Sequence, residues 1–180
     1  MLTLAVELLL IAVMPALLVG AAAWDLTSFT IPNLLPAVMG LLFFIFAAMA
    51  FASGNGDPSA MLGGFAWHVA AALVSLAAGM ALFAVGYVGG GDAKLYAAAS
   101  LWLGWDMLLE YTLLASLLGG ALTLALLALR RMPLPAMLHG QPWVLRLVDR
   151  QAGVPYGIAL AAAALMLLPK SDLFTLAFGG

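Results

Sequence analysis

The chain has 180 residues, of which 66% are hydrophobic and only 8% are charged. A soluble domain normally carries about 25% charged and roughly 45–50% apolar residues, so this composition excludes a soluble fold. The net charge of −2 leaves no electrostatic footprint for nucleic acid, which excludes that partner. There is no cysteine, and His68 and His139 are the only histidines. These counts exclude disulfides, a cysteine nucleophile, thiolate zinc sites and histidine-rich metal sites, and we expect neither metal nor cofactor.

Six apolar runs predict an all-α integral membrane protein that forms one membrane-embedded domain over residues 1–180. Most runs are long enough, as helices, to cross the roughly 30 Å of bilayer hydrocarbon. The fourth is shorter, and as a helix it rises only about 20 Å. We therefore predict a bundle of about six transmembrane helices with a short fourth helix. The runs are Leu2–Ala23, Leu34–Ala52, Met61–Tyr87, Ala93–Trp105, Met107–Leu129 and Val154–Leu168.

The first run has two readings. The segment 21–23, three alanines, resembles the small-residue cleavage site of a signal peptide. A signal peptide, however, begins with positive charge, whereas no Lys or Arg precedes this run and Glu7 lies near its start. We expect a retained first helix.

The distribution of positive charge predicts how the bundle is oriented. Four of the six cationic side chains lie between the fifth and sixth runs: Arg130, Arg131, Arg146 and Arg150. Cationic residues in short loops usually face the cytoplasm. Counting back through six spans places the loops that hold Asp25 and Lys94 on this cytoplasmic side, and the 53–60 loop outside. The count requires the short fourth helix to cross, and we expect other helices to surround it.

Two carboxylates, Asp25 and Asp92, are the candidates for chemistry. Taken singly, Asp25 could be a helix-end carboxylate that reaches headgroup water, and Asp92 a helix N-cap. Ionisable groups near membrane depth are nevertheless costly and favour a functional reading with a named partner. Two carboxylates brought close cannot both ionise easily, so one keeps a proton, which is the acid–base arrangement of an aspartic peptidase.

Three glycines precede Asp92. They should stop or loosen any helix, and their lack of side chains would let a substrate backbone approach the carboxylate closely. On their own they would equally fit a flexible turn between helices. The glycines are Gly89, Gly90 and Gly91.

Three motifs resemble those of type IV prepilin peptidases. The segment 89–95, Gly-Gly-Gly-Asp-Ala-Lys-Leu, is similar to the GxGD-x-K-L motif of that family. Asp25 followed by Ile-Pro-Asn at 31–33 resembles its first motif. Val-Pro-Tyr-Gly at 154–157 resembles its third, a Pro-aromatic-Gly element. The motifs occur in order and with fitting spacing over nearly the whole chain.

The resemblance is greatest to the short, stand-alone CpaA/TadV-type peptidases of Flp (Tad) pilus systems. It implies a multi-pass aspartic endopeptidase of the bacterial inner membrane, with Asp25 and Asp92 as the catalytic pair. Its implied partners are a prepilin substrate, cut at the cytoplasmic face between leader and hydrophobic helix, and the lipid bilayer. Contact with the pilus-assembly machinery is left open.

This chain departs from the family pattern in two places. Many members carry arginines between the first aspartate and Ile-Pro-Asn, where this chain has Thr, Ser, Phe and Thr at 27–30. Larger members also carry a cysteine-rich zinc-binding region and N-methylate the mature pilin, and this chain has no such region.

Further residues of the motifs are expected to support the site. Lys94 cannot face Asp92 from two positions away on one helix, so we expect it to snorkel or to stabilise the fold. Pro32 and Asn33 should start the second helix. Pro155 and Tyr156 are either a simple helix start and an interfacial aromatic or residues that pack beside the active site with Gly157.

Two other segments have structural interpretations. Trp143–Arg150 has apolar residues at helical spacing on one side and charges on the other, which predicts a helix lying in the headgroup region. Its arginines should bind anionic lipid. His68, inside the third run, should be a hydrogen-bonded interior residue.

Three other function classes were weighed. A proton- or ion-conducting subunit would use the two aspartates as relays, but it should carry polar groups deep in several spans. A structural or assembly subunit of a secretion apparatus is the second. A presenilin-like or signal-peptide-peptidase-like intramembrane protease shares GxGD but pairs it with Tyr-Asp and Pro-Ala-Leu, where this chain has Trp24-Asp25 and Pro-Tyr-Gly at 155–157.

Overall fold

The computed structural model describes residues 9–52, 58–133, 137 and 140–178. Within these residues the secondary structure is helical, without a strand, as predicted. Residues 2–8 of the first predicted run, which include Glu7, and residues 53–57 of the predicted 53–60 loop lie outside the described residues.

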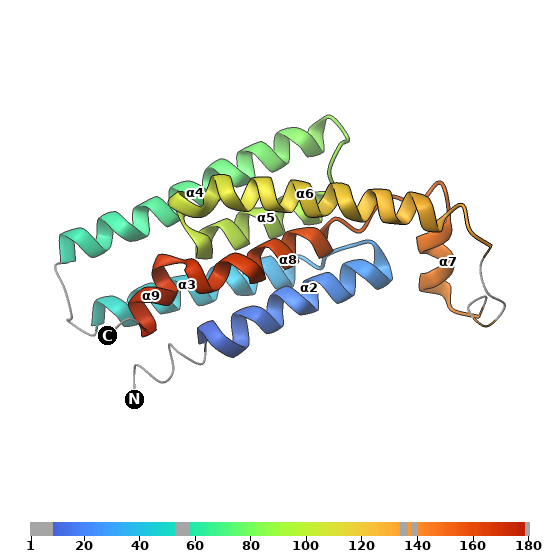
Figure 1. Cartoon of the computed structure of the whole chain (residues 1–180). Coiled ribbons are helices and arrows are strands. Elements are labelled where there is room, and N and C mark those ends of the chain that lie inside the picture. The colour runs from blue at the N-terminus through green and yellow to red at the C-terminus, as the bar shows by residue number, and fades with distance from the viewer. Residues whose placement is uncertain (1–8, 53–57, 134–136, 138–139, 179–180) are drawn as a thin grey trace.

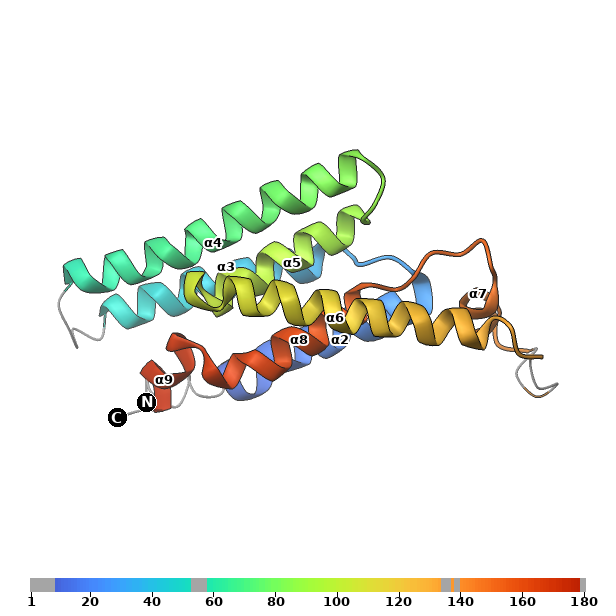
Figure 2. The same ribbon diagram turned by 45° about the horizontal axis from the view of Figure 1, so that its top comes forward.

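The main helices run alternately in opposite directions along an elongated bundle (Figures 1 and 2). They are α2 (Met14–Ser28), α3 (Leu34–Ala52), α4 (Pro58–Ala84), α5 (Gly90–Leu103), α6 (Trp105–Leu129) and α8 (Gly157–Leu167). Shorter elements are the π-helix η1 (Leu9–Val13), α7 (Pro142–Val148), the 3-10 helix η3 (Leu168–Lys170) and α9 (Asp172–Phe178). The C-terminal helix α9 lies beyond the predicted last run.

Three helices, α3, α4 and α6, are long and apolar enough to cross a membrane, and Gly157–Lys170 is a shorter apolar helical segment. Their outward faces carry large exposed apolar side chains, such as Leu41, Leu73 and Leu113, which suit lipid. The protein is therefore a multi-pass, all-α membrane protein. The count of six spans stays a prediction.

The short helix α5 lies at the centre of the bundle. Nine of its 14 residues are buried, and it packs on α3, α4, α6 and α8. Its 14 residues rise only about 21 Å, less than the roughly 30 Å of hydrocarbon. The expectation that other helices surround a short fourth helix is confirmed.

Aromatic packing holds the middle of the bundle together. Trp102 of α5 is fully buried and its indole N–H donates to the carbonyl of Met39 at 3.0 Å. Phe43 and Phe46 of α3 pack against the same indole, with ring centroids 5.7 and 5.9 Å away. The imidazole of His68 donates through Nδ1 to the carbonyl of Leu101 at 2.9 Å. His68 is therefore the hydrogen-bonded interior residue that was predicted.

Glycine decides where α4 ends. Gly86 has a φ of +80°, and the amide of Tyr87 returns to the carbonyl of Leu82 at 2.9 Å. This is a Schellman ending, in which a left-handed glycine satisfies the last carbonyls. The helix thus stops at Ala84, short of the predicted Tyr87.

The prediction that the glycine triplet interrupts the helix is wrong for two of its three members. Only Gly89 lies outside α5, as its N-cap, whereas Gly90 and Gly91 form the first turn. Glycine costs only about 0.5–1 kcal/mol in a helix, and the packing of the nine buried α5 residues outweighs that cost.

The predicted surface helix is α7, two residues shorter than expected at its C-terminal end. Its Val144 and Leu147 are buried. Arg130 at the end of α6 donates through Nε to the carbonyl of Leu147 at 2.9 Å and through an NH2 group to that of Gly153 at 2.8 Å. Arg130 thereby links the end of α6 both to α7 and to the chain that follows α7.

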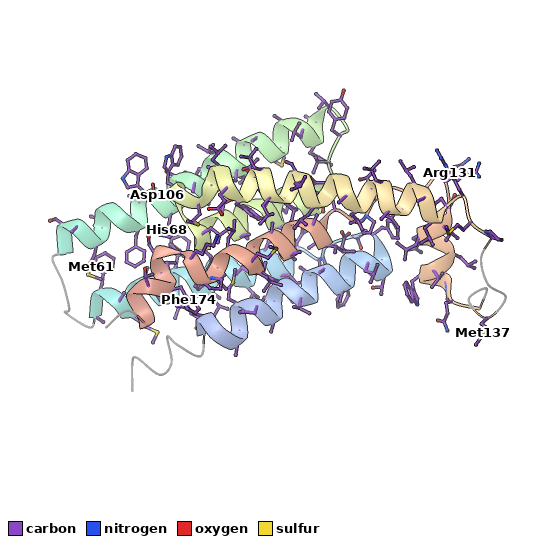
Figure 3. The ribbon with its side chains drawn as sticks, viewed as in Figure 1. Met61, His68, Asp106, Arg131, Met137 and Phe174 are labelled. Atoms are coloured by element: carbon purple, nitrogen blue, oxygen red, sulfur yellow. The ribbon has the colours of Figure 1, made fainter. Side chains whose placement is uncertain are left out.

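The charges at the two ends of the bundle differ. Asp106 and Arg131 lie near opposite ends of α6 (Figure 3). The end that holds Arg131 also holds α7, and α2 ends and α5 begins on the side of the bundle that faces it (Figures 1 and 3). The side of the membrane that this end faces stays a prediction.

We expect Gly104→Ala to lower the free energy of unfolding by about 1–3 kcal/mol. Gly104 has a φ of +83°, and a Cβ there would stand 2.8 Å from the His68 ring. Thermal unfolding in detergent measures the effect. Gly120→Ala is the matched control, because nothing lies within 4 Å of its Cβ position. Equal stability of the two variants would contradict the expectation.

Candidate active site

Asp25 lies in the last turn of α2 and is almost fully buried, with 4% of its surface exposed. Its Oδ2 accepts the backbone N–H of Gly157 at 2.7 Å. Gly157 is the first residue of α8, where free N–H groups and the helix dipole favour a negative group. The reading of Asp25 as a carboxylate that reaches headgroup water is therefore wrong.

The end of α2 turns the chain sharply back on itself. Phe29 adopts a left-handed conformation, with φ 56°, and its amide donates to the carbonyl of Asp25 at 2.8 Å. This conformation is unfavourable for a residue with a side chain. After this turn, Ile31 is buried against Gly91 of α5 and Gly157 of α8.

Asp92 is the third residue of α5 and lies in its first turn, and the N-cap of this helix is Gly89. Asp92 is therefore not itself the N-cap. Its carboxylate folds back over Gly89, so that a Cβ on Gly89 would stand 2.9 Å from Asp92 Oδ2. A carboxylate in the first helical turn is favoured by the dipole and by the free amides there.

The three motifs meet at Ile31. A Cβ on Gly91 would stand 3.1 Å from Ile31 Cβ and 3.3 Å from its backbone N. A Cβ on Gly157 would stand 2.7 Å from Ile31 Cδ1 and 2.8 Å from Asp25 Oδ2. Both glycines therefore permit close packing within the protein. The space left by the missing side chain of Gly91 is filled by Ile31. The prediction was that this space would admit a substrate backbone.

Two consecutive residues of the third motif lie at the two aspartates. Gly157 binds Asp25, and Tyr156 lines, together with Asp92, a cavity of about 190 Å³. Of the two readings of Pro155 and Tyr156, packing beside this site is therefore the one that the geometry supports.

A polar link ties the first motif to the second. Lys94 Nζ donates to Asn33 Oδ1 at 2.7 Å. Lys94 therefore stabilises the fold, as expected, by joining the start of α3 to the start of α5. Pro32 and Asn33 precede α3 immediately and their carbonyls accept its first amides, from Leu35 and Ala37. Pro155 is buried and stands two residues before α8.

One residue of the site was missed by sequence reasoning. Ile31 was quoted as part of a motif but had no assigned role, because an isoleucine carries no chemistry. The available signal was its place between a turn and a helix start, where a large apolar side chain must pack against something. No group of three or more His, Asp or Glu side chains that could hold a metal occurs among the described residues.

Arg146 of α7 closes the same end of the bundle. Its NH1 group donates to the carbonyl of Ser28 at 3.1 Å. At least one arginine of the predicted lipid-binding set thus bonds to the end of the Asp25 helix. α7 is thereby fixed near the site.

Lys94→Met and Asn33→Ala should each lower the free energy of unfolding by about 0.5–1 kcal/mol, because each removes the same hydrogen bond. The double variant should lose no more than the larger single loss, since residues in contact are not additive. A thermal unfolding cycle in detergent measures this. Additive losses would show that the two side chains stabilise the protein separately. Lys170→Met, which removes an exposed ion pair with Glu110, is the control for loss of a cation.

Comparison with known proteins gives one result. The type IV leader peptidase family matches residues 12–124, which include both aspartates and the first two motifs. No curated protein and no solved structure matches the chain significantly. The match covers more than half of the chain, and the chain belongs to the type IV leader peptidase family.

Proposed function

We propose that Asp25 and Asp92 are the catalytic pair of an aspartic endopeptidase that removes the leader peptide of a prepilin. The observation that carries the proposal is their common position. One segment, residues 156–157, touches Asp25 on one side and borders the cavity of Asp92 on the other. Family membership supports peptidase activity.

The reaction uses both carboxyl groups and one water molecule. The ionised carboxylate takes a proton from water, and the resulting hydroxide attacks the scissile carbonyl carbon. The protonated partner gives its proton to the carbonyl oxygen. When the tetrahedral intermediate collapses, the C–N bond breaks and the amine nitrogen takes the proton that the first carboxylate removed from water. A hydroxyl of the intermediate returns its proton to the second carboxylate as the carbonyl forms again. The pair shares the titration, so neither residue alone is assigned the acid role.

The location of the cut follows from the position of the pair. Asp25 lies in the last turn of α2 and Asp92 in the first turn of α5. The end of α2 and the start of α5 face the end of the bundle that carries Arg131, and the Asp92 cavity lies about halfway along α6, beside Ala115. Positive charge usually marks the cytoplasmic side, so the cut lies at the cytoplasmic face of the inner membrane. The peptide bond must be extended to be attacked, which favours the junction just before a hydrophobic helix.

The chain's content favours the Flp (Tad) pilus subtype. It has no cysteine, and only five residues, 29–33, separate α2 from α3. A zinc-binding region of the kind found in larger family members has no room between these helices. The substrate is therefore a short Flp-type prepilin, and the enzyme removes its leader without a metal.

We expect Asp25→Asn and Asp92→Asn each to lower cleavage by about 10³-fold or more, since each removes one half of the acid–base pair. Cleavage of a tagged prepilin reconstituted with the enzyme in liposomes measures it. Thermal unfolding should change little, because amide and acid are nearly isosteric. Asp106→Asn is the control, since that carboxylate is exposed near the other end of the bundle. Full cleavage by either site variant would end the proposal.

Gly157→Ala should lower kcat more than tenfold. Its Cβ would stand 2.8 Å from Asp25 Oδ2 and 2.7 Å from Ile31 Cδ1, so the carboxylate must move. A displacement of about 1 Å can cost roughly 100-fold in rate. Gly153→Ala is the matched control, because nothing lies within 4 Å of that position. The same liposome assay applies, and equal activity of both variants would show that the placement of Asp25 is not critical.

The mature product should begin at the first residues of the hydrophobic helix. N-terminal sequencing of the product formed in the liposome assay identifies the bond that is cut. A cut in the middle of the hydrophobic segment would favour an intramembrane protease instead. A cut on the periplasmic side would contradict the proposed orientation.

A further inference from the structure

The cavity beside Asp92 lies between four helices. α4 contributes Ala78, Gly79 and Leu82, and residues of α5, α6 and α8 form the remaining walls. The ribbons of α4 and α6 separate toward the end of the bundle at which α5 begins (Figures 1 and 2). The cavity therefore lies beside the carboxylate proposed for catalysis, where the lipid-facing helices α4 and α6 separate.

We infer that this cavity binds one apolar side chain of the substrate, at a position that flanks the bond to be cut. The inference rests on the proposed function, because it places the scissile carbonyl at Asp92. Neighbouring residues of an extended peptide lie about 3.3 Å apart along the chain. A peptide held at Asp92 therefore has an adjacent side chain within reach of the cavity.

Three hydroxyl groups of the cavity wall, those of Tyr96, Thr112 and Tyr156, are already paired. The hydroxyl of Tyr96 bonds to that of Thr112, and Thr112 also donates to the carbonyl of Leu108 at 2.7 Å. The hydroxyl of Tyr156 donates to the carbonyl of Ala115 at 3.2 Å. These three hydroxyls need no polar partner from a ligand, and most of the other lining residues are apolar. Burying a polar or charged side chain there would cost free energy, whereas an apolar one gains from burial.

The size of the cavity limits its occupant. Its volume is about 190 Å³. An apolar protein cavity of about 150 Å³ is known to take up benzene, so one side chain up to the size of a phenyl group fits. Two large side chains do not. The cavity therefore selects at a single position of the substrate.

The wall is also rigid on the side of Asp92. Gly79 packs so closely on Ala93 that a Cβ there would stand 2.9 Å from Ala93 Cβ. The Tyr156 ring lies directly against Gly119 of α6. A pre-formed wall loses little entropy on binding and can discriminate by shape. Ala78 and Leu82 on α4 are exposed, so they can be changed without disturbing the core.

The test measures kcat/KM for prepilins that carry Ala, Leu, Phe, Trp or Asp at each position flanking the cut. Wild type should prefer Leu and Phe over Asp at one of the two positions. Ala78→Leu should reduce the preference for Phe over Ala there by about tenfold or more, because its added isopropyl group fills the cavity. Leu82→Ala should change selectivity in the opposite direction and improve cleavage of the Trp substrate.

Ala77→Leu is the matched control, since it is exposed on the same helix and does not line the cavity. Its selectivity should equal that of wild type. If Ala78→Leu and Leu82→Ala leave selectivity unchanged, or alter all substrates in parallel, the cavity does not bind this side chain and the inference is overturned. In that case the proposed function stands, provided that Asp25→Asn is inactive. If Asp25→Asn still cleaves, the function itself is wrong and the cavity assignment falls with it.

Discussion

The hydrogen bond from the Gly157 amide to the Asp25 carboxylate is the interaction on which the site depends. A carboxylate with 4% exposure would be unfavourable without a donor, since burying an unpaired polar group costs several kcal/mol. The bond requires the start of α8 to lie against α2. Tyr156 fixes that start, because its ring lies against Gly119 and its hydroxyl reaches the carbonyl of Ala115. The position of Asp25 therefore depends on α6 through Tyr156 and Gly157.

The shortness of α5 imposes a second constraint. A helix that rises about 21 Å cannot place both of its ends in water across a bilayer, so the polar groups at its ends need partners from the protein. At its C-terminal end the carbonyl of Leu101 accepts from His68, and the amide of Gly104 returns to Ser100. At its N-terminal end the carboxylate of Asp92 lies over Gly89. The structural partner at one end is a histidine, and the partner at the other is the group proposed for catalysis.

The class of protein and the buried position of the short helix α5 could be predicted from hydropathy, and the family from three short motifs. The number of spans and the membrane side of each loop stay predictions. Helix ends could not be placed to the residue. Gly86 and Gly104 have positive φ, whereas Gly90 and Gly91 are helical, and the sequence alone does not distinguish them. The role of Ile31 was missed for a related reason. Ile31 matters because it packs against two glycines that are distant in the sequence, Gly91 and Gly157. Packing between distant residues leaves no local pattern in the sequence.

The family match ends at residue 124, before the third motif. It contains both aspartates, but neither the amide that binds Asp25 nor the ring that borders the cavity of Asp92. Asp25 is almost fully buried, so its carboxylate needs a donor from the protein. We therefore infer that the peptidase unit extends through α8. The matched segment alone would carry both reactive groups without the contact that holds Asp25 in place.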